Sequence, residues 1–489
     1  MLFCTPAFVY FLVVVFVLYW ALPWRNARVL LLLAASYWFY SRWDPWLALL
    51  VAGSSCVDYA IGRGLDAVRS PRARLLLLLT SVVGNLSLLA YFKYMNFFLT
   101  SLEAALRQVG METSFPVLAI LAPIGISFYT FEALSYTIDV FLRRIPAERN
   151  LFHFMLFILF FPHLVAGPIV RGRDFLPQIR RRKRWNWQRM QVGLQYIVLG
   201  VIKKMVISDH IAAYADPVFA APSGFSSLAC WMAVIAYSVQ IYCDFSGYTD
   251  IALGVAHLFG YRLTRNFDMP YLASNVSEFW RRWHISLSSW LRDYLFIPLG
   301  GSRGSRWLTY RNFLLVMLLG GLWHGAAWTF AIWGVLHALF LIVHHAFRQI
   351  CERWPRLNAA CETLVGRVAS WLLTLGCVML AWVFFRASSF VIAGEILSRL
   401  VFPRVGARID LPSTPFVLAL SLVIVGHVLG VLLARRQLPV KELDWLNKRL
   451  LNAIPARFAP TLGAALGIAL VVALLFAADG SKAFIYFHF

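Results

Sequence analysis

Charged residues are scarce in this sequence: only 14% of the 489 residues are Asp, Glu, Lys or Arg, against about 25% in an ordinary soluble protein. Acidic residues are scarcer than basic ones: the chain has 23 Asp and Glu and 45 Lys and Arg, which gives a formal net charge of +22. The seven cysteines contain no C-x-x-C pair, so neither a disulfide framework nor a zinc site is indicated. This composition excludes an ordinary cytosolic enzyme.

Several sequence motifs are also missing. The chain has no G-x-S-x-G elbow, P-loop, H-E-x-x-H pair or Rossmann glycine pattern, which argues against nucleotide hydrolysis and metalloproteolysis. No RNA- or DNA-binding motif accompanies the positive charge, so we expect no nucleic-acid partner. The charge is better explained by cytoplasmic loops rich in Lys and Arg.

Apolar residues, in contrast, make up 60% of the chain. Long apolar runs, such as those at 7–22, 75–98 and the 460s to 476, fit the roughly 20 residues that a helix needs to cross a bilayer. The first basic residue is Arg25, so 1–22 is predicted to be a retained span and not a cleaved signal peptide. The sequence predicts an all-α polytopic membrane protein with roughly 11–13 crossings.

Basic residues predict which loops face the cytoplasm. Four arginines cluster between positions 63 and 74, and the positive-inside rule places that loop inside. The strongest basic run, at 171–189, follows an apolar segment at 151–170 that contains Pro162, Gly167 and Pro168. If the segment at 151–170 crossed the membrane fully, this basic run would lie outside the cell, against the positive-inside rule. The two prolines also interrupt helical hydrogen bonding. We therefore predict a broken, re-entrant segment with both ends cytoplasmic, which requires an interior or wet setting.

The second half of the chain shows two further patterns. The stretch 262–311 is basic but rich in Trp, Leu and Phe, which predicts amphipathic helices in the cytoplasmic interface. The block 312–347 is apolar throughout, and as one helix it would be roughly 54 Å long against a bilayer core of about 30 Å. We predict two spans broken near the middle, followed by spans at 368–385, 415–433 and 462–476, with a cytoplasmic connection at 435–457.

His324 is the clearest candidate for chemistry, because ionisable groups at membrane depth are costly and often functional. It lies 13 residues after Arg311, about 20 Å along a helix and so near mid-membrane. Glycines at 320, 321 and 325 are expected to leave room for a substrate. An imidazole can act as a general base near neutral pH. The alternative is a histidine that hydrogen-bonds between packed helices.

A second histidine, His284, lies in the segment 275–291. Ser274 or Asn275 is predicted to cap a helix there, with Glu278 reaching back as in a capping box. On that helix His284 would share a face with Trp280 and Arg281. Arg281 and Arg282 are candidates for attracting a phosphate-bearing donor. The alternatives are an interfacial helix anchored by Trp and Arg, or lipid phosphate binding.

Acidic residues and a third histidine complete the candidates. Asp244 and Asp250 lie six residues apart in an apolar region, where they could orient a histidine, pair with an arginine or cap a helix end. His163 lies in the predicted re-entrant segment and is expected to line a chamber. His337, thirteen residues after His324, is a weaker candidate. No metal ligands are predicted.

These motifs together resemble the membrane-bound O-acyltransferase family, and in particular its bacterial alginate O-acetyltransferase branch. The resemblance is densest between positions 123 and 345 and also includes the ending at 484–489. The segments that carry it, in family order, are 123–132, 161–168, 244–248, 266–271, 278–291 and 319–325.

The resemblance implies a catalytic role for His324 and places the family's second motif histidine at His284. It also implies a single domain over 1–489, with N-terminal helices at 1–122, a catalytic core at 123–347 and C-terminal helices at 348–489. The implied fold is a ring of membrane helices around a thin core, with funnels that nearly meet at the histidine in a central chamber. Supporting residues are expected among Asn266, Asp244, Asp250, Arg281, Arg282, Trp323 and His163.

The function implied is transfer of an acetyl group from acetyl-CoA, or another acetyl thioester, across the bacterial inner membrane. The acceptor would be an exported polysaccharide of the alginate or cellulose type, reached directly or through a periplasmic relay protein. No bound cofactor is expected, since a thiolate is a good leaving group. Alternatives are a transporter of sugar or acyl precursors with a histidine proton relay, D-alanyl transfer to teichoic acid, and lysolipid acylation.

Overall fold

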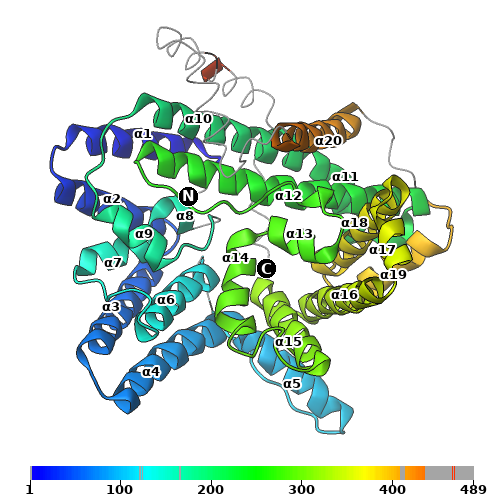
Figure 1. Cartoon of the computed structure of the whole chain (residues 1–489), viewed down its shortest axis with the longest axis horizontal. Helices are drawn as coiled ribbons and strands as arrows, with labels where there is room; N and C mark the ends of the chain where they lie inside the picture. The colour runs from blue at the N-terminus through cyan, green and yellow to red at the C-terminus, as the bar shows by residue number, and fades with distance from the viewer. Residues whose placement is uncertain are drawn as a thin grey trace. The chain divides into compact units, whose positions relative to one another are not determined.

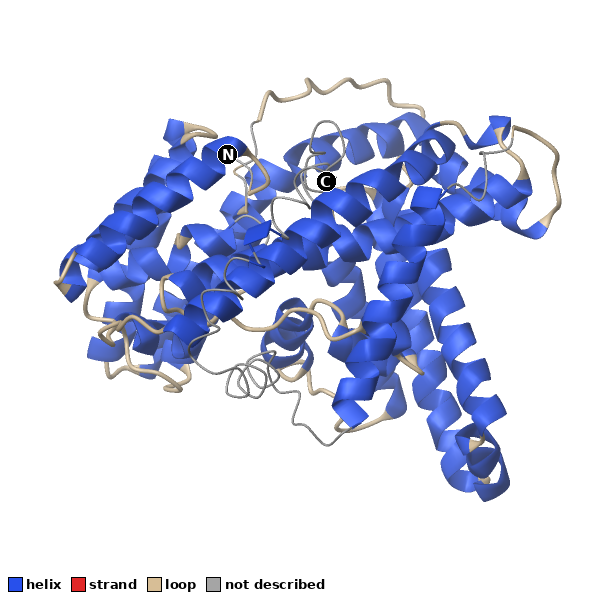
Figure 2. Cartoon of the chain, turned by 90° about the horizontal axis from the view of Figure 1, so that it is seen from above, coloured by secondary structure: helices blue, strands red, loops and turns tan. Residues whose placement is uncertain are grey.

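The structure is a computed structural model that describes residues 3–120, 123, 125–164, 167–407, 414–435, 465 and 467–468. Over these ranges the chain is built from helices and loops, as Figure 2 shows, and the one β-type pairing within them is an isolated bridge between Phe225 and Ala407. The all-α class predicted from the sequence is therefore confirmed.

The chain divides into two compact units. The first comprises Met1–Gly193 and Ala252–Thr264, and the second comprises Leu194–Ile251 and Arg265–Phe489. Two long helices, α10 and α12, contribute residues to both units. The single domain with three segments stays a prediction.

The first unit contains the helices coloured blue to cyan in Figure 1. They are α1 (Pro6–Ala21), α2 (Arg25–Ser41), α3 (Pro45–Ala67), α4 (Pro71–Leu89), η1 (Ala90–Tyr94), α5 (Met95–Gln108), α6 (Ile126–Phe141), α7 (Leu151–Ile158), α8 (Phe161–Leu164) and α9 (Gly172–Ile179). Helix α6 is buried along nearly its whole length and packs against α3, α4 and α9. It therefore forms the core of this unit.

The apolar segment at 151–170 is broken, as its prolines predict. Helix α7 ends at Ile158, and a separate short helix, α8, begins at Phe161 with Pro162 in its first turn. Gly125, which caps α6, has a φ of 73° and lies so close to this segment that an added Cβ would be 2.6 Å from the Leu164 carbonyl oxygen. Only glycine adopts this conformation without strain and leaves that space. The break is confirmed; the placement of both ends in the cytoplasm stays a prediction.

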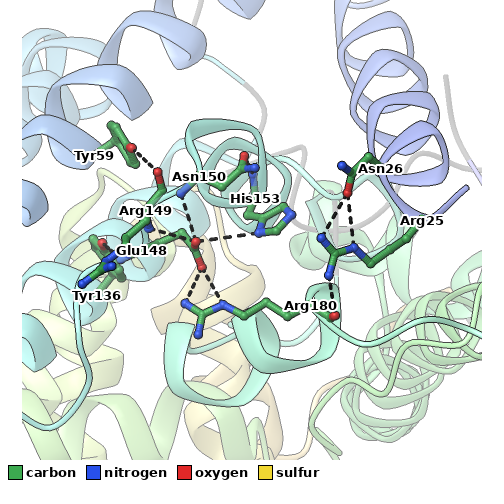
Figure 3. Close-up of polar contacts among 9 residues, drawn as sticks. All are labelled: Arg25, Asn26, Tyr59, Tyr136, Glu148, Arg149, Asn150, His153 and Arg180. Carbon is green, nitrogen blue, oxygen red and sulfur yellow. Dashed lines mark hydrogen bonds and ion pairs between the residues drawn. The ribbon is translucent and has the colours of Figure 1, made fainter.

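A buried carboxylate, Glu148, holds the loop between α6 and α7 in place (Figure 3). Its oxygens accept hydrogen bonds from the backbone N–H groups of Arg149 and Asn150 at 2.9 and 3.0 Å, and from the guanidinium of Arg180 at 2.7 Å. Burial alone would raise the pKa of the Glu148 carboxyl, but bonds from His153, Arg180 and Asn150 outweigh it and lower the pKa to about 2. The carboxylate is thus charged at neutral pH.

The second unit contains most of the remaining helices. With the two shared helices they are α10 (Trp187–Val201), η2 (Ile202–Ser208), α11 (Asp209–Ala220), η3 (Pro222–Gly224), α12 (Ser227–Leu258), η4 (Pro270–Leu272), α13 (Val276–Arg282), α14 (Ile285–Leu291), η5 (Arg292–Phe296), α15 (Arg306–His324), α16 (Trp328–Arg353), α17 (Pro355–Glu362), α18 (Leu364–Arg386), α19 (Phe390–Val401) and α20 (Thr414–Arg435). Helices α15 and α16 form an antiparallel pair, and α16 also packs against α13 and α18. The predicted break in the block 312–347 is confirmed between α15 and α16.

The protein is a multi-pass membrane protein. Among the described residues, six continuous helical stretches are long and apolar enough to cross a bilayer, namely Pro45–Ala67, Pro71–Gln108, Trp187–Ala220, Ser227–Leu258, Trp328–Arg353 and Leu364–Arg386. Shorter apolar helices occupy Pro6–Ala21, Leu151–Leu164 and Thr414–Leu429. The total of 11–13 crossings stays a prediction. The span predicted at 462–476 and the ending at 484–489 lie outside the described residues except for positions 465, 467 and 468, and of the connection at 435–457 only Arg435 is described.

Candidate active site

His324 is the last residue of α15, where the chain breaks before α16 begins. The two helices on either side of the break pack closely at glycines. A Cβ on Gly334 would lie 3.1 Å from the Leu318 Cα, and one on Gly321 would lie 3.1 Å from the Gly334 Cα. The space beside these glycines is filled by the neighbouring helix backbone. The expectation that the glycines leave room for a substrate is therefore wrong at Gly321, because close helix packing takes up that room.

The imidazole of His324 is enclosed by aromatic rings and is only 3% exposed. The ring of Trp333, from α16, stands edge-on to the imidazole, and the two ring centroids are 5.1 Å apart. The ring of Phe385, from α18, also stands edge-on to the imidazole, with a centroid distance of 5.2 Å. Trp323 precedes it in α15, and their ring centroids are 5.1 Å apart. Water is largely excluded from this environment, and the site has a low local dielectric constant.

His284 does not lie on one helix with Trp280 and Arg281, so that prediction is wrong. Helix α13 ends at Arg282, and His284 has a φ of 44° and begins the separate helix α14. A left-handed conformation is unusual for a residue with a side chain, and such strain is often found at functional sites. The imidazole is completely buried.

The side chain of Asn266 holds the His284 imidazole in one orientation. The Asn266 Oδ1 atom lies 3.1 Å from His284 Nδ1 and accepts hydrogen bonds from the backbone N–H of Ser286 at 3.2 Å and its hydroxyl at 2.9 Å. Since a backbone N–H can only donate, Oδ1 is the acceptor, and His284 Nδ1 must carry the proton. The Nε2 atom of a neutral His284 is then the one without a proton.

The rings of the two histidines are near neighbours. Their ring centroids are 6.2 Å apart, which is too far for a direct hydrogen bond between the rings. Phe245, from the Asp244–Tyr248 motif on α12, stands edge-on to His284 at 4.7 Å, and Trp323 lies 5.8 Å from it. Four motifs that are distant in the sequence therefore meet around the two imidazoles.

Asp244 and Asp250 have partners that sequence reasoning did not anticipate. Both lie inside α12, so neither caps a helix end. Asp250 pairs with Lys203 at 2.6 Å, and Asp244 pairs with Lys204 at 2.6 Å. Lys204 is buried and also contacts Asp209 at 2.7 Å. These pairs connect the second unit's part of α12 to η2 beside the His284 environment.

A π-helical turn explains how two consecutive lysines both reach α12. The segment η2 has this wider winding, which changes the angular spacing of an α-helix and is common at functional sites. The backbones also approach each other closely, because a Cβ on Gly247 would lie 2.8 Å from the Gly200 carbonyl oxygen. Two adjacent lysines in an apolar run are unusual enough in the sequence to indicate buried ion pairs. The sequence does not show which acidic residues pair with them.

The predicted capping box at the start of α13 is confirmed with Asn275 as the cap. The Asn275 side chain accepts from the Glu278 backbone N–H at 2.8 Å, and the Glu278 carboxylate accepts from the Ser274 backbone N–H at 2.9 Å. Arg282 forms an ion pair with Glu278 at 2.7 Å, whereas Arg281 is exposed. Burial would raise the pKa of Glu278, but bonds from Ser274 and Arg282 outweigh it and hold the pKa below its usual value. Arg281 is the freer of the two arginines to meet an anion.

His163 belongs to the first unit, where it is buried against a carboxylate. Its Nε2 atom lies 3.3 Å from Glu132 Oε2, and each side chain is 1% exposed. The other Glu132 oxygen accepts from the backbone N–H of Val170 at 2.9 Å. The pair connects α6 to the broken segment after α7. The role of His163 as a chamber residue stays a prediction.

The structure thus brings together His324, His284, Asn266 and Trp323, and it adds walls that the sequence analysis missed. Phe245, Trp333 and Phe385 carry no chemical signal in the sequence, because aromatic residues are common in apolar helices. His337 is fully buried among aromatic rings, including Trp333 at 4.7 Å. Its neighbours are aromatic, and its role as a weaker candidate stays a prediction.

Comparison with known proteins identifies the family. The model of the membrane-bound O-acyltransferase family matches residues 73–390. The probable alginate O-acetylase AlgI of Azotobacter vinelandii is 44% identical over 396 residues, covering 80% of this chain and 76% of its own length. The AlgI protein of Pseudomonas aeruginosa is 43% identical, covering 80% and 73%, and the peptidoglycan O-acetyltransferase of Helicobacter pylori is 36% identical, covering 82% and 80%. The chain belongs to the membrane-bound O-acyltransferase family and is an O-acyltransferase.

Proposed function

We propose that this protein is an inner-membrane O-acetyltransferase that moves acetyl groups from a cytoplasmic thioester, acetyl-CoA or a related donor, to an exported polysaccharide. The observation that carries the proposal is the pair of buried imidazoles, 6.2 Å apart, of which His284 is held by Asn266. Family membership and the similarity to proteins named as O-acetylases support it. The acceptor is a polysaccharide hydroxyl, or a relay protein that carries the acetyl group onward.

In the proposed reaction, His324 removes the proton from the acceptor hydroxyl as its oxygen attacks the thioester carbonyl carbon. The carbon–sulfur bond breaks, the thiolate leaves, and the proton held by His324 can pass to the sulfur. General-base catalysis of this kind contributes about 10²- to 10⁴-fold. A thiolate leaves readily, so the proposal needs no bound cofactor. His284, through the unprotonated Nε2 atom, helps to orient the acceptor.

The aromatic walls have a separate role in this proposal. A thioester held next to a base would be hydrolysed if water had free access to the site. The rings of Trp333 and Phe385 contact the His324 imidazole from two helices and keep water out. Binding energy of the substrates would then displace one of these rings during each cycle, which couples acetyl transfer to acceptor binding.

The first experiment replaces the proposed base. The His324→Ala variant is reconstituted in liposomes, and release of coenzyme A from acetyl-CoA is followed with a soluble polysaccharide acceptor. We expect the rate to fall at least about 10²-fold, with the same amount of protein in the membrane. The matched control is His344→Ala, on the half-buried part of α16, which should keep the wild-type rate.

Normal acetyl transfer by His324→Ala would contradict the assignment. Uptake of sugar or acyl precursors into sealed vesicles without cleavage of the thioester would support a transporter instead. Replacing acetyl-CoA by a D-alanyl thioester in the same assay tests the teichoic acid alternative directly. Chemical analysis of the polymer from a deletion strain would then identify the acceptor.

A further inference from the structure

A cavity of about 480 Å³ lies in the first unit, and its walls are strongly basic. It is lined by Trp20, Arg28, Arg182, Lys183, Arg184 and Trp185. Its volume is in the range of sites that bind small ligands, roughly 300–1,000 Å³. Four cations and two tryptophans make up the lining, so an anion is the ligand that its chemistry favours.

The four cations have no carboxylate partner among the residues that the structure describes. Arg28 instead donates to the backbone carbonyls of Leu22 and Lys183, at 2.7 and 2.9 Å. Its guanidinium also lies over the Trp20 ring, 4.9 Å from the centroid. Arg28 is therefore held in position by neutral groups, which leave its charge uncompensated. Arg182 and Arg184 are exposed at the rim.

Lys183 is the most constrained of these cations. Its ammonium lies 4.2 Å from the centre of the Tyr261 ring, and its stem packs against Gly260, whose φ is 84°. Burial, together with the nearby charges of Arg189 and Arg181, lowers the pKa of Lys183 to about 8. A bound anion would relieve this repulsion between like charges. The cluster is therefore electrostatically incomplete without a ligand.

The cavity lies at the end of an apolar helix whose outer face is exposed. Val13 and Val17 on α1 are 54% and 58% exposed, and their spacing places them below Trp20 on one side of the helix. Tryptophans at helix ends mark the boundary between the hydrocarbon core and the headgroups. The basic segment that follows α9 is on the side predicted to be cytoplasmic. A headgroup in the cavity could thus extend an acyl chain along α1.

We infer that this cavity binds the phosphate of an anionic phospholipid in the cytoplasmic leaflet, with one acyl chain along the Val13 and Val17 face of α1. Arginine side chains suit phosphate oxygens because of their forked donors. Basic pockets beside membrane helices are a recognised kind of lipid headgroup site. This inference is independent of the acetyl-transfer proposal, since none of its residues belongs to the histidine site.

The test titrates the purified full-length protein, in detergent, with dioleoylphosphatidylglycerol and counts bound lipids by native mass spectrometry. Dioleoylphosphatidylcholine is the comparison lipid, because its choline group is repelled by the cations. The Arg182→Gln/Arg184→Gln variant removes two exposed charges without disturbing the core. We expect its affinity for phosphatidylglycerol to fall about fivefold for each charge removed. The control Arg69→Gln/Arg72→Gln, also exposed in the first unit, should stay within about twofold.

A second variant, Lys183→Gln, provides a pH readout. The affinity of the wild-type protein for phosphatidylglycerol should fall as the pH rises through about 8, where Lys183 loses its charge. The affinity of the variant should not change over this pH range. At pH 7 the variant should bind the lipid more weakly than the wild-type protein. Equal binding of the two lipids, or equal loss in the test and control variants, would overturn the inference. Displacement of the lipid by excess coenzyme A would also overturn it, because the phosphate site would then belong to the acyl donor.

Discussion

Two buried histidines in this protein have similar apolar surroundings but different polar partners. His163, in the first unit, lies 3.3 Å from the Glu132 carboxylate, and His284, in the second, lies 3.1 Å from the Asn266 amide oxygen. Aromatic rings surround both: Phe160 is 5.7 Å from His163, and Phe245 is 4.7 Å from His284. The partner is therefore the main difference between them.

That difference has a chemical consequence. Glu132 contacts His163 with one oxygen and accepts a hydrogen bond from the Val170 N–H group with the other, so it holds α6 against the broken segment. An amide oxygen has no net charge, so it fixes the orientation and tautomer of His284 while leaving the ring neutral. Only a neutral imidazole has a nitrogen that can accept a proton or a hydroxyl hydrogen. The two environments thus differ in the polar group that each offers to its imidazole, a carboxyl at His163 and an amide at His284.

Exchanging the partner at His284 should have the largest effect. In Asn266→Asp the new carboxylate favours the imidazolium, so we expect acetyl transfer at neutral pH to fall about 10²-fold. The rate should recover partly as the pH rises, because His284 then loses the extra proton. Steady-state rates of coenzyme A release across pH measure this. Ser286→Ala, which removes only one donor to the same oxygen, should change the rate by a few-fold at most, and an unchanged rate in Asn266→Asp would refute the distinction.

The reverse exchange should affect stability more than activity. Glu132→Gln keeps an oxygen for the Val170 N–H group but removes the carboxyl group beside His163. We expect it to lower the free energy of unfolding by about 2 kcal/mol and to leave the rate within about twofold. Thermal unfolding in detergent and the coenzyme A assay measure the two effects. Glu132→Ala, which also leaves the Val170 N–H group unpaired, should be less stable still. Loss of activity in a stable Glu132→Gln protein would show that His163 takes part in the reaction.

A third buried histidine, His153, extends the comparison with the smallest expected effect. It lies 3.7 Å from Glu148, whose pKa is lowered from 4.5 to about 2. Such a carboxyl adds stability above pH 4.5, and this contribution is lost as the pH falls through about 2. Glu148→Gln should reduce stability at pH 7 by about 1 kcal/mol, since Arg180 is half-exposed, and should flatten the acid dependence. Unfolding measured from pH 7 to about 2 tests this, and an acid profile unchanged by the substitution would contradict it.

Local patterns predicted several features of the fold correctly. The break between α15 and α16 followed from an apolar block too long for one span, and the break after α7 followed from prolines within an apolar segment. The capping box at Asn275 and Glu278 was visible because its residues lie close together in the chain. In each case the responsible interactions are local, so residue order was enough to find them.

The candidate site could be predicted only in part. His324 and His284 were found from motifs, but the predicted face shared by His284, Trp280 and Arg281 was wrong, because helical periodicity assumes that the helix continues. The lysine partners of Asp244 and Asp250 were missed for a related reason. A π-helical turn changes which residues face α12, and nothing in the residue order reveals that turn.

The amino-acid sequence alone established a helical membrane protein, its motifs and the histidine expected to react. These features follow from composition, from local hydrogen bonding and from the transfer of apolar side chains out of water. The partners of the buried polar groups were decided by folding, as in Asn266 with His284 and Glu132 with His163. A buried polar group must find a partner to offset its loss of water, but which partner is close depends on how distant segments pack.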